Sequence, residues 1–324
     1  MTEPILSLNT TDVELSNDTQ WNNSTNKFST NELIVVYFSL VITLLGLVGN
    51  GIVFWFLMFR IQKTSFTVYI LNLAFADLLL LFSAMTIFLY IFFRQSIGQM
   101  QKEIFNTGIC ITLAYYAGLF LLTAISVERC LSLTYPFWYR CQRPRHQSAI
   151  VSASLWVVSV LLTYMDYFGC NDEAFTKREW KCTAMTISTA SLSLLIFSPA
   201  MVLSSLILFI KVWTKTWRQH SSKLYLVIVV TVSIFILFTI PPRILALLDY
   251  FKIVPMQFFT LYSWSLFCSV VNSAANPFVY FFVGRIGKQG VMGSIQGALQ
   301  KVFKEDSEIS QESAPTTEAS EIKM

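Results

Sequence analysis

Residues 66–93 read FTVYILNLAFADLLLLFSAMTIFLYIFF, an apolar stretch in which Asp77 is the one charged residue. A helix needs about 20 apolar residues to cross a hydrocarbon core about 30 Å thick. This stretch therefore predicts a membrane-spanning helix. A charged side chain inside a membrane costs several kcal/mol, so Asp77 is a candidate functional residue.

Six more stretches of this kind occur, and together they predict a seven-transmembrane helix bundle over residues 33–285. The chain is 54% hydrophobic and 13% charged, whereas soluble domains are about 25% charged. Helices are expected because single strands would leave backbone groups unpaired in lipid, and a β-barrel would show short alternating segments. The fold class is an all-α membrane protein, with expected spans at 33–59, 66–93, 104–133, 148–168, 184–213, 224–248 and 258–283.

The segment over residues 1–32 is polar and predicts an extracellular, glycosylated N-terminal tail. Its four acceptor sequons begin at Asn9, Asn17, Asn22 and Asn23. With this tail outside, the majority of the 23 Lys and Arg residues fall on the cytoplasmic side, as the positive-inside rule requires. An odd number of spans then places the C-terminus in the cytosol of a multi-pass plasma-membrane protein.

The segment after the seventh span divides into two parts. Residues 286–304 alternate apolar and basic side chains, which predicts a short amphipathic cytoplasmic helix on the membrane lipid. Residues 305–324 are acidic and rich in Ser and Thr, which predicts a disordered tail. Its hydroxyl residues are possible phosphorylation sites. The net charge of +4 gives no indication of a nucleic-acid partner.

The order of short motifs along the spans resembles the rhodopsin-like (class A) G-protein-coupled receptors. These motifs are Gly49-Asn50, LNLAFAD ending at Asp77, SVERC over residues 126–130, Trp156, Pro199, Pro241 and NPFVY over residues 276–280. The stretches TAISVERCLSLTYPFWYRCQRPRHQSA and SANPFVYFFVG are similar to the Mas and Mas-related subfamily. TW followed by HSSKLY is most similar to Mas itself.

The resemblance implies a receptor and not an enzyme. It would respond to an extracellular peptide or small cationic molecule and act on heterotrimeric G proteins of the calcium-mobilising type. Receptor kinases and arrestin would act at the C-terminal tail, and no cofactor is expected. A transporter or channel is the alternative, although no inverted repeat is evident. An intramembrane enzyme is disfavoured because the two histidines, His146 and His220, fall in predicted cytoplasmic loops.

The resemblance places the G-protein coupling surface at the cytoplasmic end of the third span. Arg129 would reach into the G-protein cavity, and Glu128 would pair with it at rest. Phe137 and Arg140 lie in the following loop, and Tyr280 ends the NPFVY motif. The sixth-span position that often holds a restraining acid is Ser221, which predicts some basal signalling.

The outer ends of the fourth and sixth spans carry the candidate ligand-binding residues. Asp166 could pair with a cationic group of a ligand, or it could face lipid headgroups. Arg243 could select an anionic group such as a peptide C-terminus. Aromatic walls are expected from Tyr116, Tyr164, Tyr167 and Trp264, although helix packing explains them equally well.

Two further sites follow from the resemblance. The usual third-span disulfide position is Ile104, so a bridge between Cys170 and Cys182 is expected instead, as in Mas relatives. Asp77, Asn272 and Asn276 match the polar core that binds sodium in many class A receptors. Gly118 replaces the Ser that often contributes, so a water-filled hydrogen-bond network is expected there in place of an ion.

Overall fold

The computed structural model describes residues 30–61, 63–93, 97–144, 146–171, 187–189, 191–215, 222–254 and 258–285. Several predictions fall outside this part of the chain. They are the glycosylated tail with Asn9, Asn17, Asn22 and Asn23, the amphipathic helix, the Ser/Thr-rich tail and the later cysteine of the expected disulfide. These remain predictions.

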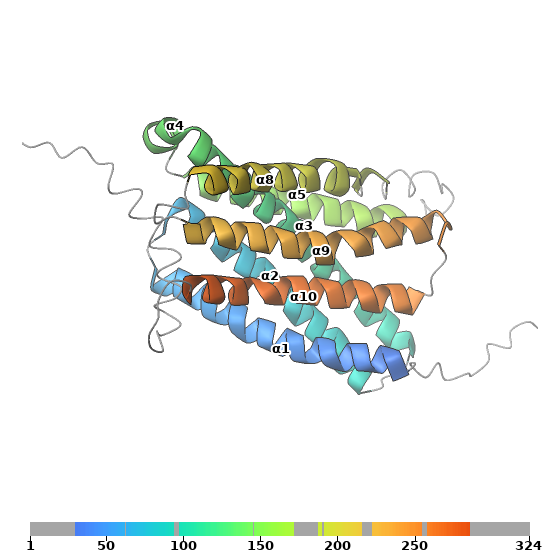
Figure 1. Ribbon diagram of the computed structural model, residues 1–324. Coiled ribbons are helices and arrows are strands. Elements are labelled where there is room, and N and C mark those ends of the chain that lie inside the picture. Colours follow the sequence, from blue (N-terminus) through green and yellow to red (C-terminus); the bar gives the residue numbers. More distant parts are fainter. Residues whose placement is uncertain are drawn as a thin grey trace, which may run out of the picture.

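The described residues form a bundle of long helices that run side by side (Figure 1). The predicted seven-transmembrane fold is confirmed. The spans are α1 (Thr30–Phe59), α2 (Ser65–Phe92), α3 (Ile97–Thr134), α5 (Gln147–Asn171), η1 (Leu192–Phe197) with α8 (Ser198–Lys215), α9 (Ser222–Tyr250) and α10 (Phe258–Arg285). The short helix α4 (Pro136–Cys141) lies beyond one end of the bundle.

Six of the described spans are apolar enough to cross a membrane by composition alone, and α10 is not among them. This helix carries Asn272, Asn276 and several serines, which lower its mean hydropathy. Asn276 and Ser273 are buried against neighbouring helices. Because these polar groups point into the bundle rather than toward lipid, α10 belongs among the spans despite its composition.

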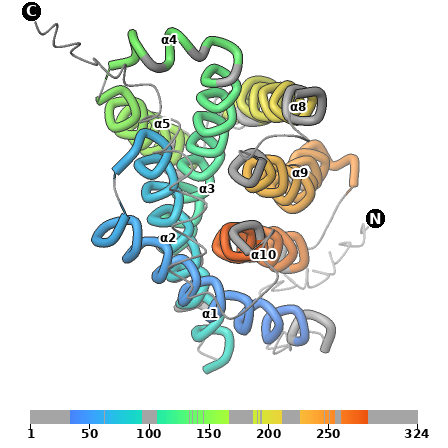
Figure 2. The backbone as a smooth tube through the Cα atoms, turned by 60° about the vertical axis from the view of Figure 1, so that its left-hand side comes forward, coloured from blue at the N-terminus to red at the C-terminus, as the bar shows by residue number. Residues whose placement is uncertain are grey.

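Helix α3 runs through the middle of the bundle, with α2 and α5 on one side and α8 and α9 on the other (Figure 2). In its most apolar stretch 56% of residues are buried, against 22% for α5. Elsewhere the bundle exposes large apolar side chains such as Phe38, Phe82 and Leu237. A soluble protein rarely exposes so much apolar surface, whereas lipid accommodates it.

Helices α1 and α10 approach each other closely because small residues lie between them. A Cβ atom added to Gly46 would stand 2.8 Å from the Cβ atom of Ala274, and one added to Gly49 would stand 3.0 Å from Pro277. Small residues at helix contacts let backbones pack closely in membranes. The first and last spans are thereby held together, which closes the bundle.

The fifth span contains a π-helical turn, η1, directly before Pro199. Proline cannot donate a backbone hydrogen bond, and π-turns of this kind recur at functional sites in membrane and soluble proteins. Phe197, at the end of the turn, packs against Phe120 of α3 with ring centroids 4.1 Å apart. The turn thus aims an aromatic side chain at the central helix.

Candidate functional site

A polar core at mid-depth ties α1, α2 and α10 together. The Asn276 amide donates a 2.7 Å hydrogen bond to the Asp77 carboxylate. Asn50 donates 3.0 Å bonds to the backbone carbonyls of Gly46 and Ser273. The structure therefore brings Asn276 to Asp77 as predicted, whereas Asn272 is only half-buried on the same helix.

The polar core also holds unused acceptors. The side-chain oxygens of Asn50 and Asn276 are buried and have no hydrogen-bond partner. A Cβ atom added to Gly118 would meet nothing within 4 Å, so that position on α3 offers space but no hydroxyl. Such oxygens suit ordered water, which typically satisfies buried polar groups. They would also suit a hard cation.

Arg129 is 4% exposed and lies in the half of α3 that leads to α4. Its guanidinium stands 4.2 Å from the centre of the Phe66 ring on α2. A cation over an aromatic face is stabilised by the ring quadrupole. The side chain therefore points between α2 and α3, toward the interior of the bundle.

Glu128 pairs with Arg143 rather than with Arg129, which corrects the resting pair expected from the sequence. It also accepts a 2.9 Å hydrogen bond from the Tyr139 hydroxyl. Glu128 and Arg129 have different partners because successive side chains on a helix point about 100° apart. Arg129 faces the core, and Glu128 faces the short helix α4.

Arg143 joins four helices at the end of the bundle where α4 lies. It donates to Ser65 at the start of α2, to Glu128 on α3 and to Ser148 on α5 at 2.6 Å. Its guanidinium also stands 4.9 Å from the Tyr139 ring of α4. The Arg143 side chain is 6% exposed, so it is a buried structural contact rather than a surface charge.

Helix α4 presents Phe137 outward, with 73% of its side chain exposed. This agrees with the expectation that Phe137 meets a cytoplasmic partner. The Arg140 side chain lies outside the described side chains. Tyr139, two residues after Phe137, is held by Glu128. The Tyr139 hydrogen bond thus connects α4 to α3 beside the Glu128–Arg143 pair.

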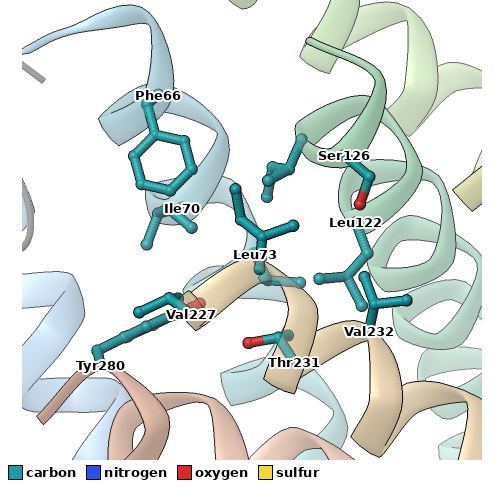
Figure 3. A pocket seen from close by; sticks show the side chains of 11 residues that line it. Phe66, Ile70, Leu73, Leu122, Ser126, Val227, Thr231, Val232 and Tyr280 are labelled. Atoms are coloured by element: carbon teal, nitrogen blue, oxygen red, sulfur yellow. The ribbon is translucent and has the colours of Figure 1, made fainter. Parts of the chain in front are cut away.

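A small, partly open cavity of about 10 Å³ lies between α2, α3, α9 and α10 (Figure 3). Its walls are mainly apolar, apart from the hydroxyl-bearing side chains of Ser126, Thr231 and Tyr280. The Tyr280 ring lies beside Val227 at one side. Sequence reasoning gave no signal for this cavity, because a void depends on packing between distant helices.

The half of the bundle away from α4 contains a second cluster, formed by Tyr115, Tyr116, Asp166 and Arg243. The buried Tyr116 hydroxyl donates a hydrogen bond to the Asp166 carboxylate. The Arg243 guanidinium stands 3.8 Å from the centre of the Tyr115 ring and 5.9 Å from that of Tyr116. We call these four residues the outer cluster; it joins α3, α5 and α9.

The structure brings three predicted ligand residues together, namely Tyr116, Asp166 and Arg243. Tyr164 and Trp264 are 62% and 49% exposed, so they stand apart from this packed cluster. The Tyr167 side chain lies outside the described side chains. Tyr115 was missed, because only a structure shows which of two adjacent tyrosines covers Arg243.

The comparisons with known proteins agree with this arrangement. Residues 49–280 match the family of seven-transmembrane receptors of the rhodopsin type. The chain belongs to that family. Proto-oncogene Mas of Mus musculus is 45% identical over 280 residues, covering 84% of each chain. Proto-oncogene Mas of Homo sapiens is 44% identical with the same coverage. Mas-related G-protein coupled receptor member H of Rattus norvegicus is 38% identical, covering 91% of this chain and 90% of the relative.

The predicted Mas-related, class A receptor is thus confirmed. The chain is a G-protein-coupled receptor of the plasma membrane, with several spans, an activating ligand and a G protein as partners. Its family consists of signalling receptors and not of enzymes. The transporter or channel alternative is set aside by this membership.

Proposed function

We propose that this receptor is activated by a peptide at the outer cluster and couples to G proteins that mobilise calcium. The observation that supports the proposal is that α9 contributes side chains to both ends of the bundle. It contributes Arg243 to the outer cluster and Val227, Ile228, Thr231 and Val232 to the cytoplasmic cavity. A ligand that shifts one end of α9 therefore acts on the other.

The physical basis is a population shift. Pro241 and Pro242 lie inside α9, close to Arg243. Proline removes backbone hydrogen bonds and permits a kink, so the two ends of α9 can change their relative direction. A ligand stabilises whichever bundle conformation it binds more tightly. In the active conformation, the cytoplasmic half of α9 would withdraw from Tyr280 and open a path to Arg129.

The expected membrane orientation agrees with a ligand site at the extracellular end of the bundle and a G-protein site at the cytoplasmic end. The four sequons of the N-terminal segment and the basic residues of the cytoplasmic loops both favour an extracellular N-terminus and a cytoplasmic C-terminus. The C-terminal segment contains Ser307, Ser310, Ser313, Thr316, Thr317 and Ser320. We assign receptor kinases and then arrestin to these hydroxyls, because phosphates add charge that arginine clusters can bind.

The decisive experiment measures G-protein dissociation and calcium release in cells that express increasing amounts of the receptor. Because Ser221 replaces a restraining acid, we expect a basal signal that rises with receptor number. Arg129→Ala should abolish it at equal surface expression. A panel of peptides, applied to both forms, then tests ligand activation.

Two results would contradict the proposal. A signal that persists unchanged in Arg129→Ala would mean that the receptor's own coupling surface does not produce it. A signal carried entirely by G proteins that inhibit adenylyl cyclase, with no calcium release, would replace the calcium-mobilising class.

A further inference from the structure

Arg243 is a cation in the outer half of the bundle that lacks a carboxylate in direct contact. Across the described parts of the chain, no Asp or Glu oxygen comes within 4.0 Å of its guanidinium. Its contacts are the rings of Tyr115 and Tyr116. A charge inside a membrane is costly and is normally paired. The site therefore favours an incoming anion.

Asp166 does not provide that direct partner, because it is already engaged. It accepts the Tyr116 hydrogen bond and acts on Arg243 only through its electric field. A cationic ligand would have to compete with Tyr116 for this carboxylate. An anionic ligand meets no such competition at Arg243.

The direction of the Arg243 contacts strengthens this reasoning. The Arg243 guanidinium lies over the Tyr115 ring. A guanidinium carries five N–H donors in one plane, more than its interaction with Tyr115 can use. Two parallel N–H bonds match the two oxygens of a carboxylate. Arg243 as a whole residue is half-buried.

We propose that the outer cluster recognises a carboxylate of the ligand through Arg243, with the partly exposed ring of Tyr115 receiving an adjoining apolar group. Asp166 is a positioning residue: its hydrogen bond orients Tyr116, and its negative charge acts on the Arg243 guanidinium. This rests on the proposed function, since it names the chemistry of the activating ligand. A free peptide C-terminus carries such a carboxylate, and so does a small organic acid.

The test uses the full receptor purified in detergent without any G protein, so its failure is distinct from a failure to couple. The probe is phenylacetate, and the matched cationic probe is 2-phenylethylammonium. Each is titrated to saturation while the thermal unfolding midpoint is measured. We expect phenylacetate to raise the wild-type midpoint by about 2–4 °C when it exceeds its Kd about five-fold.

The variants separate the roles of the two charged residues. Arg243→Gln should lose the phenylacetate shift, and Arg243→Lys should retain part of it, because an ammonium keeps the charge but not the fork. Asp166→Asn should keep the shift or enlarge it, since an opposing negative charge is removed. Each variant is compared with its own midpoint without probe, so a change in intrinsic stability does not affect the result.

Three outcomes would overturn the proposal. One is the same phenylacetate shift in wild type and Arg243→Gln. Another is no phenylacetate shift in the wild type at any soluble concentration. The third is a shift only with 2-phenylethylammonium that disappears in Asp166→Asn, which would assign ligand recognition to the carboxylate.

Discussion

At the scale of single residues, Arg143 makes polar contacts with three helices and with α4. It binds Glu128, Ser65 and Ser148 and stacks on Tyr139. Removing one member of a buried ion pair leaves the other charge unpaired, which costs far more than replacing both members. The pair thus gives a clear stability prediction.

Arg143→Met should lower the free energy of unfolding by roughly 3–5 kcal/mol, because Glu128 stays buried without its cation. The double variant Arg143→Met with Glu128→Gln should recover much of that loss. Thermal midpoints of the solubilised receptor measure both. Equal losses in the single and double variants would show that packing of the Arg143 stem matters, and not its charge.

Residue-level prediction from the sequence succeeded where a motif fixes the neighbours. The Asp77–Asn276 contact follows from two motifs that occur in order along the chain. Glu128 was assigned the wrong partner, because Arg129 is adjacent in sequence but points to another side of α3. The role of Arg143 was not foreseen, since no local pattern indicates that Ser65, Glu128 and Ser148 converge on it.

At the scale of helices, the α1–α10 contact depends on the absence of a side chain at Gly46. A Cβ atom there would overlap the Cβ atom of Ala274 on α10 and approach Leu81 on α2. Nearby on α1, Gly51 has open space around its Cβ direction. The two glycines provide a matched pair within one helix.

Gly46→Ala should therefore destabilise the receptor by about 1–3 kcal/mol, because inserting a methyl group into a packed contact forces the helices apart. Gly51→Ala should cause no loss, and alanine's higher helix propensity favours it slightly. The comparison is made by thermal midpoint and by surface expression. If both variants behave alike, the close approach of α1 and α10 does not limit stability.

The sequence located every span, but it misjudged where helices end. The apolar stretch over 104–133 predicted the third span, whereas α3 runs from Ile97 to Thr134. Hydropathy reports the thickness of the membrane, and a helix can continue past it into water. Helix α4 gave no apolar signal, and the π-turn of the fifth span gave none either, because both are set by local hydrogen bonding.

At the scale of the whole molecule, the remaining question is which end of the bundle faces outward. Treating intact cells with a glycosidase should lower the apparent mass of the receptor. Replacing Asn9, Asn17, Asn22 and Asn23 by Gln should abolish that change, because these sequons are expected outside. A C-terminal epitope should bind antibody only after permeabilisation. Labelling of that epitope on intact cells would reverse the topology.

The general architecture was predictable because seven apolar stretches in lipid admit essentially one solution, a bundle of helices. The grouping of the four outer-cluster residues in space was not predictable. Tyr115, Asp166 and Arg243 come from three spans, and their grouping depends on the tilt and rotation of each helix. Those quantities are decided by side-chain packing between helices.

The π-turn over Leu192–Phe197 has a consequence for anyone who compares pockets among these receptors. A π-turn holds one residue more than an α-helical turn, and one residue in an α-helix corresponds to a rotation of about 100°. Counting backward from Pro199 along an ideal helix would therefore assign Ser188 or Thr189 to the wrong side of the fifth span. Equivalent positions before Leu192 should be matched between receptors by superposing backbones. Otherwise, mutations intended for the ligand pocket will alter side chains that face lipid.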